Sequence, residues 1–312
     1  MASTLRVAVV GVGHLGRYHA QKYAALPGCE LVGLVDANPE RLAQVSAEVG
    51  APGHARLEDV LPLVDALSIA TPTQTHHAVG MACLTAGKHV LIEKPIASTS
   101  AQGRELVQAA AQAGRVLQVG YLQRYNPAMV ACRTRLGTPQ FIESVRIAPF
   151  VERGADVDVV LDLMSHDLDL VLSMIDAPLQ GLHAVGVSIL TPSTDLANAR
   201  LIFANGSVAN LTASRISAKA ERKMRIFQQG GYFSLDFVEP SVKAYSQGKD
   251  DSTRPVLEEM AVSKGDELQS EIEAFLHAVR TGEAPPAGGA EGLAVLELAE
   301  RVIGDIQRNT LP

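Results

Sequence analysis

The chain has 312 residues, with 47% hydrophobic and 20% charged residues and a formal net charge of -7. This length and composition describe a globular protein with room for two domains and exclude a disordered chain. The basic residues are scattered, which argues against nucleic acid as a partner, and the apolar run at residues 7–10 is too short to span a membrane. Three widely spaced cysteines give neither a metal-binding spacing nor an even disulfide set, so we expect a cytoplasmic protein.

The amino-terminal segment predicts a strand, a glycine turn and a helix. The apolar run at residues 5–10 is followed by Gly11-Val12-Gly13-His14-Leu15-Gly16. The first glycine of such a turn permits the bend, the second lets a pyrophosphate approach the backbone, and the third lets the helix pack on the strand. A second predicted strand ends at Asp36, about 20 residues after the last glycine, where an acid accepts hydrogen bonds from ribose hydroxyls. An acid there also repels a 2′-phosphate, so we expect NAD rather than NADP as the cofactor.

Strands and helices keep alternating as far as residue 121, which predicts a parallel sheet wrapped by helices over residues 1–122. Two of the predicted strands run into Thr71-Pro72 and into Glu93-Lys94-Pro95. In open α/β sheets the ligand crevice lies outside the carboxyl ends of the strands. Lys94 could therefore be a cation beside a cofactor or a proton-transfer group. The alternative is a solvated charge pair with Glu93.

The pattern changes after residue 127, and residues 123–312 predict an α+β domain with an open, mostly antiparallel sheet. Asn205-Gly206 is typical of a hairpin turn between two of its strands. Closing helices are expected at residues 267–280 and 291–308, the last of which can pack back on the first domain. Strands are expected at residues 141–147, 182–190, 197–203, 207–214, 223–229, 231–237 and 242–246.

One predicted helix in this second half carries acids among aliphatic residues. Asp162 and His166 are spaced i and i+4, so they share one face, where the carboxylate can orient the imidazole as a base. A zinc site is an alternative, but no clear third and fourth ligand stands out, so we expect no metal. A second alternative is that Asp162 caps the helix or forms a salt bridge.

Residues 215–225 form the basic cluster of the sequence. It fits a solvated strand edge, which lysine and arginine commonly protect. The functional alternative is a site for a phosphorylated or nucleotide-linked substrate.

Five motifs occur in chain order, and together they resemble one known family. They are Gly11-Val12-Gly13-His14-Leu15-Gly16, Thr71-Pro72-Thr73-Gln74-Thr75-His76, Gly87-Lys88-His89-Val90, Glu93-Lys94-Pro95 and Arg124-Tyr125-Asn126-Pro127. The resemblance, over essentially the whole chain, is to the glucose-fructose oxidoreductase / inositol dehydrogenase / rhizopine catabolism (Gfo/Idh/MocA) family of NAD(P)-dependent oxidoreductases. It implies an α/β protein with a Rossmann dinucleotide-binding domain, a carboxyl-terminal substrate and oligomerisation domain, and hydride transfer between a sugar-type secondary alcohol and nicotinamide.

The same resemblance assigns roles to individual residues. Lys94, Asp162 and His166 are expected to be catalytic, Glu93 to orient their surroundings, and Pro95 to follow a cis peptide bond. His76 has the alternative role of a polar residue near a helix start. The expected cofactor-binding residues are Gly11, Gly13, His14, Leu15, Gly16, Asp36, Thr71, Pro72, His76, Glu93 and Lys94. The expected substrate-binding residues are Lys94, Arg124, Tyr125 and His166.

Within the family, residues 160–167 and 214–217 resemble the UDP-N-acetylglucosamine 3-dehydrogenases, which make a 3-keto sugar nucleotide. The chain departs from many relatives, which have glycines just before Asp162. An inositol or free-sugar dehydrogenase, an enzyme reducing a bilin or imine, and a non-catalytic NAD-binding sensor or regulator are the alternatives. In relatives the open sheet face often serves as a subunit interface, which implies a homodimer or homotetramer.

Overall fold

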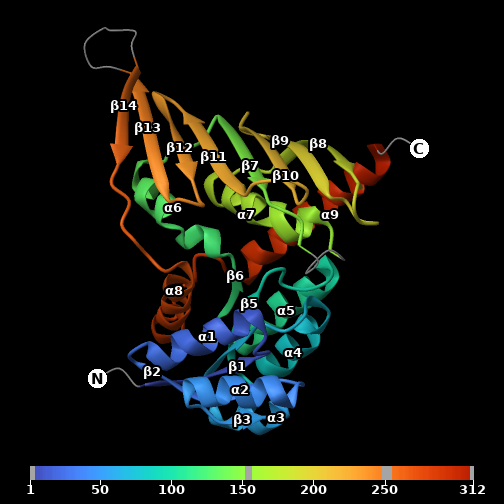
Figure 1. The fold of residues 1–312 in the computed structure, drawn as a ribbon, viewed down its shortest axis with the longest axis vertical. Coiled ribbons are helices and arrows are strands. Elements are labelled where there is room, and N and C mark those ends of the chain that lie inside the picture. The colour runs from blue at the N-terminus through green and yellow to red at the C-terminus, as the bar shows by residue number, and fades with distance from the viewer. Residues whose placement is uncertain (1–3, 152–156, 248–254, 310–312) are drawn as a thin grey trace. The chain divides into compact units, whose positions relative to one another are not determined.

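The computed structural model describes residues 4–151, 157–247 and 255–309. The chain forms two compact units, each drawn in Figure 1. Unit 1 comprises residues 1–121 and 268–296, and unit 2 comprises residues 122–267 and 297–312. The sequence prediction divided the chain once, at residue 122, and gave residues 268–296 to the second domain. The structure instead places this segment in unit 1.

Unit 1 is built on a 6-stranded sheet with the order β3-β2-β1-β4-β5-β6, in which all neighbours are parallel. The order reverses between β1 and β4, and in such sheets the ligand crevice lies at the carboxyl ends of the strands at this switch point. This is the predicted Rossmann architecture. The short strand β3 was not predicted. The strands are β1 (Leu5–Val10), β2 (Cys29–Val35), β3 (Gly53–His54), β4 (Ala66–Ile69), β5 (His89–Glu93) and β6 (Leu117–Gly120).

Capping residues determine where two helices of unit 1 begin and end. At the start of α2 the Asn38 side chain accepts a hydrogen bond from the Arg41 amide and Pro39 is the first helical residue; Gly50 ends the helix with a φ of 71°. In the same way, the Thr99 side chain accepts a hydrogen bond from the Gln102 amide at the start of α5, and Gly114 ends that helix with a φ of 60°. The helices are α1 (His14–Ala25), α2 (Pro39–Val49), α3 (Leu57–Val60), α4 (Thr73–Thr85) and α5 (Ser100–Ala113), with a short 3-10 turn η1 (Leu61–Leu63).

Helix α8 (Glu267–Thr281) belongs with this sheet because its apolar side chains complete the core. Ile272, Phe275 and Leu276 are buried in one cluster with strand residues such as Val7 and Val9. The following segment is held by backbone hydrogen bonding, since the Val119 amide donates to the Ala287 carbonyl at 2.8 Å. The sequence prediction expected only the last helix to pack back on the first domain, whereas unit 1 takes in the whole segment 268–296, which includes most of α8 and the start of α9.

Unit 2 is built on an 8-stranded sheet with the order β14-β13-β12-β11-β7-β10-β9-β8. Only β7 and β10 among these neighbours are parallel, so the sheet is mostly antiparallel, as predicted. The Asn205-Gly206 hairpin between β9 and β10 is confirmed, with Gly206 at a φ of 86°. The edge strand β14 was not predicted. The strands are β7 (Phe141–Ile147), β8 (Leu179–Val187), β9 (Leu196–Phe203), β10 (Val208–Ser214), β11 (Glu221–Gln228), β12 (Gly231–Asp236), β13 (Ser241–Gln247) and β14 (Pro255–Met260).

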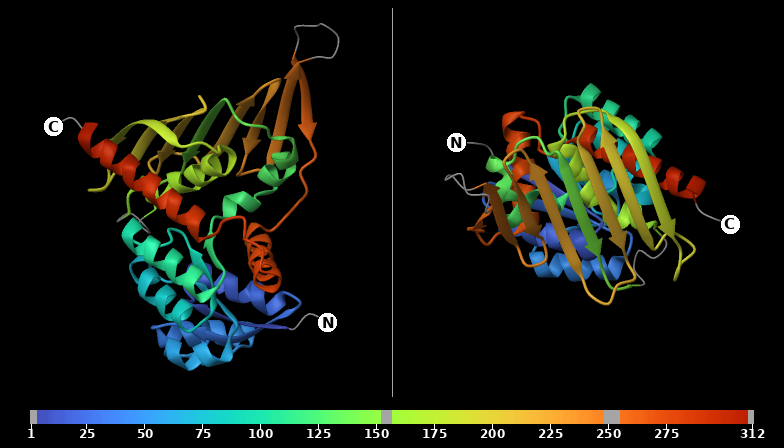
Figure 2. Two further views of the ribbon diagram at one scale, coloured as in Figure 1. Left: turned by 180° about the vertical axis from the view of Figure 1, so that it is seen from behind. Right: turned by 90° about the horizontal axis from the view of Figure 1, so that it is seen from above.

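One face of this sheet packs on helices and the other is open, as Figure 2 shows from above. Side chains that alternate along the strands, such as Ile142, Leu211 and Met224, are fully buried beneath it. The helical elements of unit 2 are η2 (Leu122–Tyr125), α6 (Pro127–Cys132), η3 (Arg133–Arg135), the π-helical η4 (Val160–Met164), α7 (Ser165–Met174) and the end of α9 (Gly289–Asn309). Among the described residues, no helix is long and apolar enough to cross a membrane.

Candidate active site

The glycine turn between β1 and α1 has the geometry of a dinucleotide site. Gly11 has a φ of 84°, and a Cβ at this position would lie 2.8 Å from the Ala70 backbone. A Cβ at Gly16 would lie 1.7 Å from the Gly11 carbonyl oxygen, so the helix can approach the turn only without a side chain there. A Cβ at Gly13 would meet no protein atom within 4 Å, which leaves space beside the amino terminus of α1. The turn therefore fits a pyrophosphate, for which backbone N–H groups and the helix dipole provide the binding.

The acid at the end of β2 is buried and tightly held. Its carboxylate accepts hydrogen bonds from the Val12 and Asn38 amides, each at 2.8 Å, and from the Arg41 guanidinium at 2.6 and 3.0 Å. Burial raises the pKa of Asp36, but the hydrogen bonds from Arg41 and the two amides outweigh it, so the pKa lies below its usual range. The Asp36 carboxylate is therefore held in its ionised form beside the glycine turn. Arg41 was missed because no motif marks it.

The predicted residues after β4 divide into two groups. Thr71 and Thr73 are partly exposed and Pro72 is exposed, whereas His76 on α4 is buried. The two ring nitrogens of His76 lie 2.8 Å from the Pro95 carbonyl oxygen and 2.9 Å from the Thr71 carbonyl oxygen. His76 thus ties the loop after β4 to the loop after β5. Burial lowers the pKa of His76, against the opposing effect of these two carbonyls.

The Glu93-Lys94-Pro95 motif lies where the sequence predicted, at the carboxyl end of β5. The Lys94–Pro95 peptide bond is cis, as expected. Lys94 is partly exposed, whereas Glu93 is buried and its carboxylate lies 2.8 Å from the Nε2 atom of His19 on α1. In unit 1, therefore, Lys94 lies partly at the surface, whereas the adjacent Glu93 lies in the interior.

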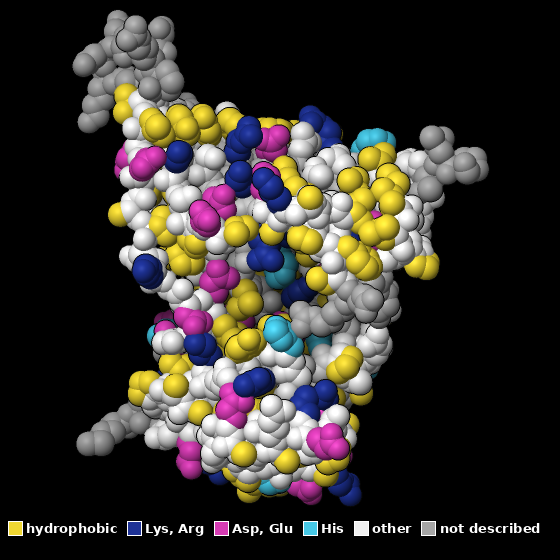
Figure 3. All heavy atoms as spheres, viewed as in Figure 1, with side chains coloured by type: hydrophobic (Ala, Val, Ile, Leu, Met, Phe, Trp, Pro, Cys, Tyr) yellow, Lys and Arg dark blue, Asp and Glu magenta, His cyan; other side chains and the backbone are white. Residues whose placement is uncertain are grey.

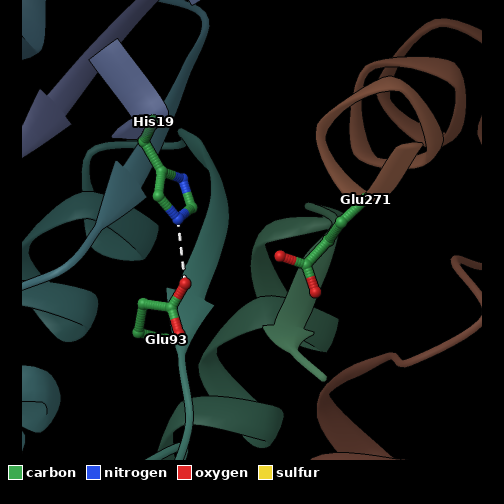
Figure 4. A group of neighbouring side chains, drawn as sticks. All are labelled: His19, Glu93 and Glu271. Atoms are coloured by element: carbon green, nitrogen blue, oxygen red, sulfur yellow. Dashed lines mark hydrogen bonds and ion pairs between the residues drawn. The ribbon is translucent and has the colours of Figure 1, made fainter. Parts of the chain in front are cut away.

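Figure 4 shows the neighbourhood of this carboxylate, with Glu271 of α8 turned toward the same space. His19, Glu93 and Glu271 each offer a ligand atom, and these atoms lie within 4.8 Å of one another. No other such group of histidine, cysteine and acidic side chains is found in the part of the chain that the structure describes. Sequence reasoning missed His19, although the buried stripe of α1, which is Gly16, His19, Ala20 and Tyr23, has the spacing that would have placed it inside.

In unit 2, Asp162 lies in the π-helical turn η4 and His166 in the first turn of α7. Both side chains are partly exposed. The prediction of one regular helix was wrong in this detail, and π-helical turns occur often at functional sites. Just before η4, the Asp158 carboxylate accepts a hydrogen bond from the Val160 amide at 2.8 Å.

Arg124 and Tyr125, expected to bind substrate, are both buried. The guanidinium of Arg124 donates to both carboxylate oxygens of Asp169 at 2.7 to 3.0 Å. A second buried pair, Arg146 with Asp167, has the same form, with bonds of 2.8 and 2.9 Å. The acids on either side of Leu168 thus anchor α7, and the sequence pattern gave no indication of their partners.

The basic cluster at residues 215–225 is not one surface. Arg215 is buried and donates to the Val157 and Thr194 carbonyls, and its Nε atom lies 3.4 Å from the Asp195 carboxylate. Lys223 and Arg225 are exposed and lie near Glu221 and Glu143 respectively. On the face seen in Figure 3, basic side chains are interspersed with acidic ones. Lys223 and Arg225 lie on β11, which pairs with β12 on one side and β7 on the other, so the interpretation as a strand edge is wrong. Arg215 is a structural residue.

Two family models match the chain. That of the oxidoreductase family with an NAD-binding Rossmann fold, GFO_IDH_MocA, matches residues 5–121, and that of the GFO/IDH/MocA C-terminal domain matches residues 129–234. The chain is 41% identical over 304 residues to UDP-N-acetylglucosamine 3-dehydrogenase from Acidithiobacillus ferrooxidans, covering 96% of each chain. It is 27% identical over 238 residues to scyllo-inositol 2-dehydrogenase (NAD(+)) from Bacillus subtilis, covering 70% of this chain and 69% of the other.

Solved structures of dehydrogenases also match this chain. A structure of the Acidithiobacillus ferrooxidans enzyme matches with a TM-score of 0.94 at 40% identity, covering 97% of this chain and 98% of the other. Levoglucosan dehydrogenase in complex with NADH and levoglucosan matches with a TM-score of 0.88 at 18% identity, covering 98% of each chain, which shows a common fold. The identity over nearly the whole length, together with the glycine turn and Asp36, confirms the expected fold and cofactor class. The chain belongs to the Gfo/Idh/MocA family of NAD(P)-dependent oxidoreductases and is a dehydrogenase.

Proposed function

We propose that this chain oxidises the 3-hydroxyl of UDP-N-acetylglucosamine to a 3-keto sugar nucleotide, with NAD as the cofactor. The observation that carries the proposal is the 41% identity to a UDP-N-acetylglucosamine 3-dehydrogenase over 96% of both chains. The inositol dehydrogenase relative is less similar, at 27% over 70% of this chain. The resemblance of residues 160–167 and 214–217 to the UDP-sugar enzymes supports the same choice.

Oxidation of a secondary alcohol releases a hydride and a proton, and NAD supplies the hydride acceptor when bound. The remaining task for the protein is to handle the proton. We assign its acceptance from the substrate hydroxyl to the imidazole of His166. Asp162, four residues earlier, orients that imidazole and stabilises its charged form. Lys94 donates a hydrogen bond to the same hydroxyl and polarises it.

The test is a substrate panel of UDP-sugars, free sugars and cyclitols, each assayed with NAD and with NADP. Reduction of NAD with UDP-N-acetylglucosamine is expected, with a 3-keto product identified by mass spectrometry after borodeuteride reduction. No turnover with this sugar nucleotide would contradict the proposal, and turnover of a cyclitol instead would favour the inositol dehydrogenase alternative. Tight NAD binding without any turnover would favour the sensor alternative.

Three variants test the residue roles. Lys94→Ala and His166→Ala should each lower kcat by about 100-fold or more while NAD binding persists, because general acid–base groups contribute on this scale. His183→Ala is the matched control, since His183 is an exposed histidine of β8 in the same unit as His166. If both active-site variants keep wild-type kcat, the assignment is wrong.

We also propose that the chain forms a homodimer or homotetramer through the open face of the 8-stranded sheet. A row of aromatic rings crosses four neighbouring strands at this face, with centroid distances of 5.7, 4.8 and 4.4 Å between Phe141, Phe227, Tyr232 and Tyr245 in turn. These rings are half-buried, and a second subunit on this face would cover the rest of their apolar surface. Sedimentation equilibrium of the wild type and of Tyr232→Glu tests this, and a wild type that stays monomeric at micromolar concentration would rule the interface out.

We further propose a cytoplasmic location, which agrees with the free thiol state of Cys29, Cys83 and Cys132. Cell fractionation with an antibody against the chain tests it, and recovery outside the cytoplasmic fraction would contradict it.

A further inference from the structure

A chain of four buried polar side chains lies behind the Glu93-Lys94-Pro95 motif. Tyr23 and His19 on α1, Ser68 on β4 and Glu93 on β5 are all less than one-tenth exposed. The Tyr23 hydroxyl lies 2.8 Å from Ser68 Oγ, Ser68 Oγ lies 3.1 Å from His19 Nδ1, and His19 Nε2 lies 2.8 Å from Glu93 Oε1. Three elements of unit 1 are thereby joined by side-chain hydrogen bonds.

The direction of these hydrogen bonds follows from what each group can donate. A proton on Nε2 of His19 makes this nitrogen the donor to the Glu93 carboxylate. With that single ring proton, Nδ1 accepts from the Ser68 hydroxyl, and Ser68 accepts from the Tyr23 hydroxyl. Burial raises the pKa of Tyr23, so this hydroxyl keeps its proton and remains a donor. In this arrangement all donors are directed toward the carboxylate.

The carboxylate is confined on its other side by β6. Glu93 and Gly120 are register partners on the parallel strands β5 and β6. A Cβ at Gly120 would lie 2.9 to 3.1 Å from the carboxylate atoms of Glu93. Gly120 thus provides the space that the carboxylate occupies when it turns toward His19.

A divalent cation could in principle use His19, Glu93 and Glu271, but the geometry favours hydrogen bonding. Their ligand atoms lie within 4.8 Å of one another, and the closest pair, His19 Nε2 and Glu93 Oε1, is at hydrogen-bonding distance. A nitrogen that donates a hydrogen bond has no lone pair left for a metal.

We propose that His19 is a positioning residue for the reaction: it holds the Glu93 carboxylate inward and so fixes the backbone from which Lys94 projects. The helix that carries His19 begins at the glycine turn, so the same rigid element supports both the cofactor turn and the lysine loop. This inference rests on the proposed role of Lys94. It adds a residue that acts only through Glu93 and touches no reacting atom.

The kinetic test compares His19→Ala, His19→Gln and Gly120→Ala, using the best substrate of the wild type. The alanine variant loses the donor, and Gly120→Ala displaces the same carboxylate without touching His19, so each should lower kcat about 10- to 100-fold, as small misplacements of catalytic groups do. The Kd for NAD should change less than about threefold, since the glycine turn is intact. His19→Gln keeps a donor and should recover most of kcat.

Two features separate positioning from general destabilisation. The double variant His19→Ala/Gly120→Ala should lose no more activity than either single variant, because both changes act through one carboxylate. Gly53→Ala is the matched control, since a Cβ there would crowd Leu42 of the same unit at 2.9 to 3.3 Å and has no atom of the lysine loop among its nearest neighbours. Additive losses, or an equal loss of kcat in Gly53→Ala at equal melting temperature, would overturn the proposal.

A structural measurement keeps the test independent of the substrate. In a crystal structure of His19→Ala the Glu93 carboxylate should leave its position against Gly120, and the Lys94 ammonium should shift by about 1 Å or more relative to wild type. If both groups keep their wild-type positions, His19 does not position Lys94, whatever the substrate proves to be. If they shift but Lys94→Ala retains activity, the proposed role of Lys94 fails instead.

Discussion

The guanidinium of Arg41 donates two hydrogen bonds to the carboxylate of Asp36, from Nη2 at 2.6 Å and from Nε at 3.0 Å. Arg41 lies in the first turn of α2, and its side chain is 46% exposed while that of Asp36 is 4% exposed. The acid that should repel a 2′-phosphate therefore already has a positively charged neighbour. We expect both residues to influence the choice between NAD and NADP, with opposing effects.

Replacing Asp36 with serine should move the preference toward NADP. The change removes the repelling charge and leaves Arg41 available for a 2′-phosphate, so the ratio of kcat/KM for NADP to that for NAD should rise about tenfold or more. Arg41→Ala in the wild-type background is the matched control and should lower the same ratio. Initial rates with both cofactors provide the measurement, and an unchanged ratio in Asp36→Ser would show that Asp36 does not face the adenosine ribose.

The glycine turn offers a pair of substitutions with opposite expectations. Gly13→Ala should leave the melting temperature almost unchanged, because the new Cβ meets no protein atom within 4 Å, but should weaken NAD binding about tenfold by filling the space for the pyrophosphate. Gly16→Ala should destabilise the fold itself, since its Cβ would lie 1.7 Å from the Gly11 carbonyl oxygen. Isothermal titration with NAD and thermal unfolding separate the two. Normal NAD affinity in Gly13→Ala would contradict the placement of the pyrophosphate.

The buried pair of Arg124 and Asp169 should behave as a structural element. Arg124→Leu leaves an uncompensated buried carboxylate and should lower the free energy of unfolding by about 3–5 kcal/mol. Arg135→Ala is the control, because Arg135 pairs with Glu258 in an exposed ion pair that should contribute less than about 1 kcal/mol. Denaturant unfolding measures both. An Arg124→Leu variant of normal stability but raised KM would instead support the predicted substrate role.

Asp195 should make the stability of unit 2 depend on pH in the acid range. Its carboxylate accepts hydrogen bonds from the Ile189, Leu190 and Thr191 amides at 2.6 to 3.0 Å. Burial acts to raise the pKa of Asp195, but these amides outweigh it and lower the pKa to about 2. The ordinary value in an unfolded chain is about 3.9, so the ionised form contributes about 3 kcal/mol above that pH, and this contribution is lost as the pH falls toward 2.

The measurement is unfolding of the wild type and of Asp195→Asn from pH 7 to pH 2.5. The difference in free energy between the two should be constant near neutral pH and should shrink below about pH 4. A difference that stays the same down to pH 2.5 would mean that Asp195 is not the titrating group.

The features that the sequence allowed us to predict are those encoded by neighbouring residues. The glycine turn, the acid after β2, the caps at Asn38 and Gly50, and the hairpin at Asn205-Gly206 each depend on local backbone chemistry, and all are present. The features that were missed depend on residues far apart in the chain. The partner of Glu93 lies 74 residues earlier, and that of Arg124 lies 45 residues later. The periodicity of the sequence does not predict such pairs. A buried polar residue needs a hydrogen-bonding partner, and that partner can lie far away in the chain.

The π-helical turn at Asp162 is another feature that the sequence pattern did not predict. The spacing of Asp162 and His166 predicted a shared face of a regular α-helix, whereas the turn that carries Asp162 is π-helical, with i→i+5 hydrogen bonds. The pattern of aliphatic residues did not distinguish the two kinds of turn. The edge strand β14 was missed because its residues, Pro255–Met260, include two adjacent acids and do not alternate clearly.

The division of the chain into its two units constrains how such a protein can change during evolution. Unit 1 is assembled from residues 1–121 and 268–296, so its core is encoded by two separated stretches of one gene. A recombination event that exchanged only the first stretch would leave the sheet without Ile272, Phe275 and Leu276. Exchange of one contiguous stretch of the gene therefore cannot transfer the complete cofactor-binding unit.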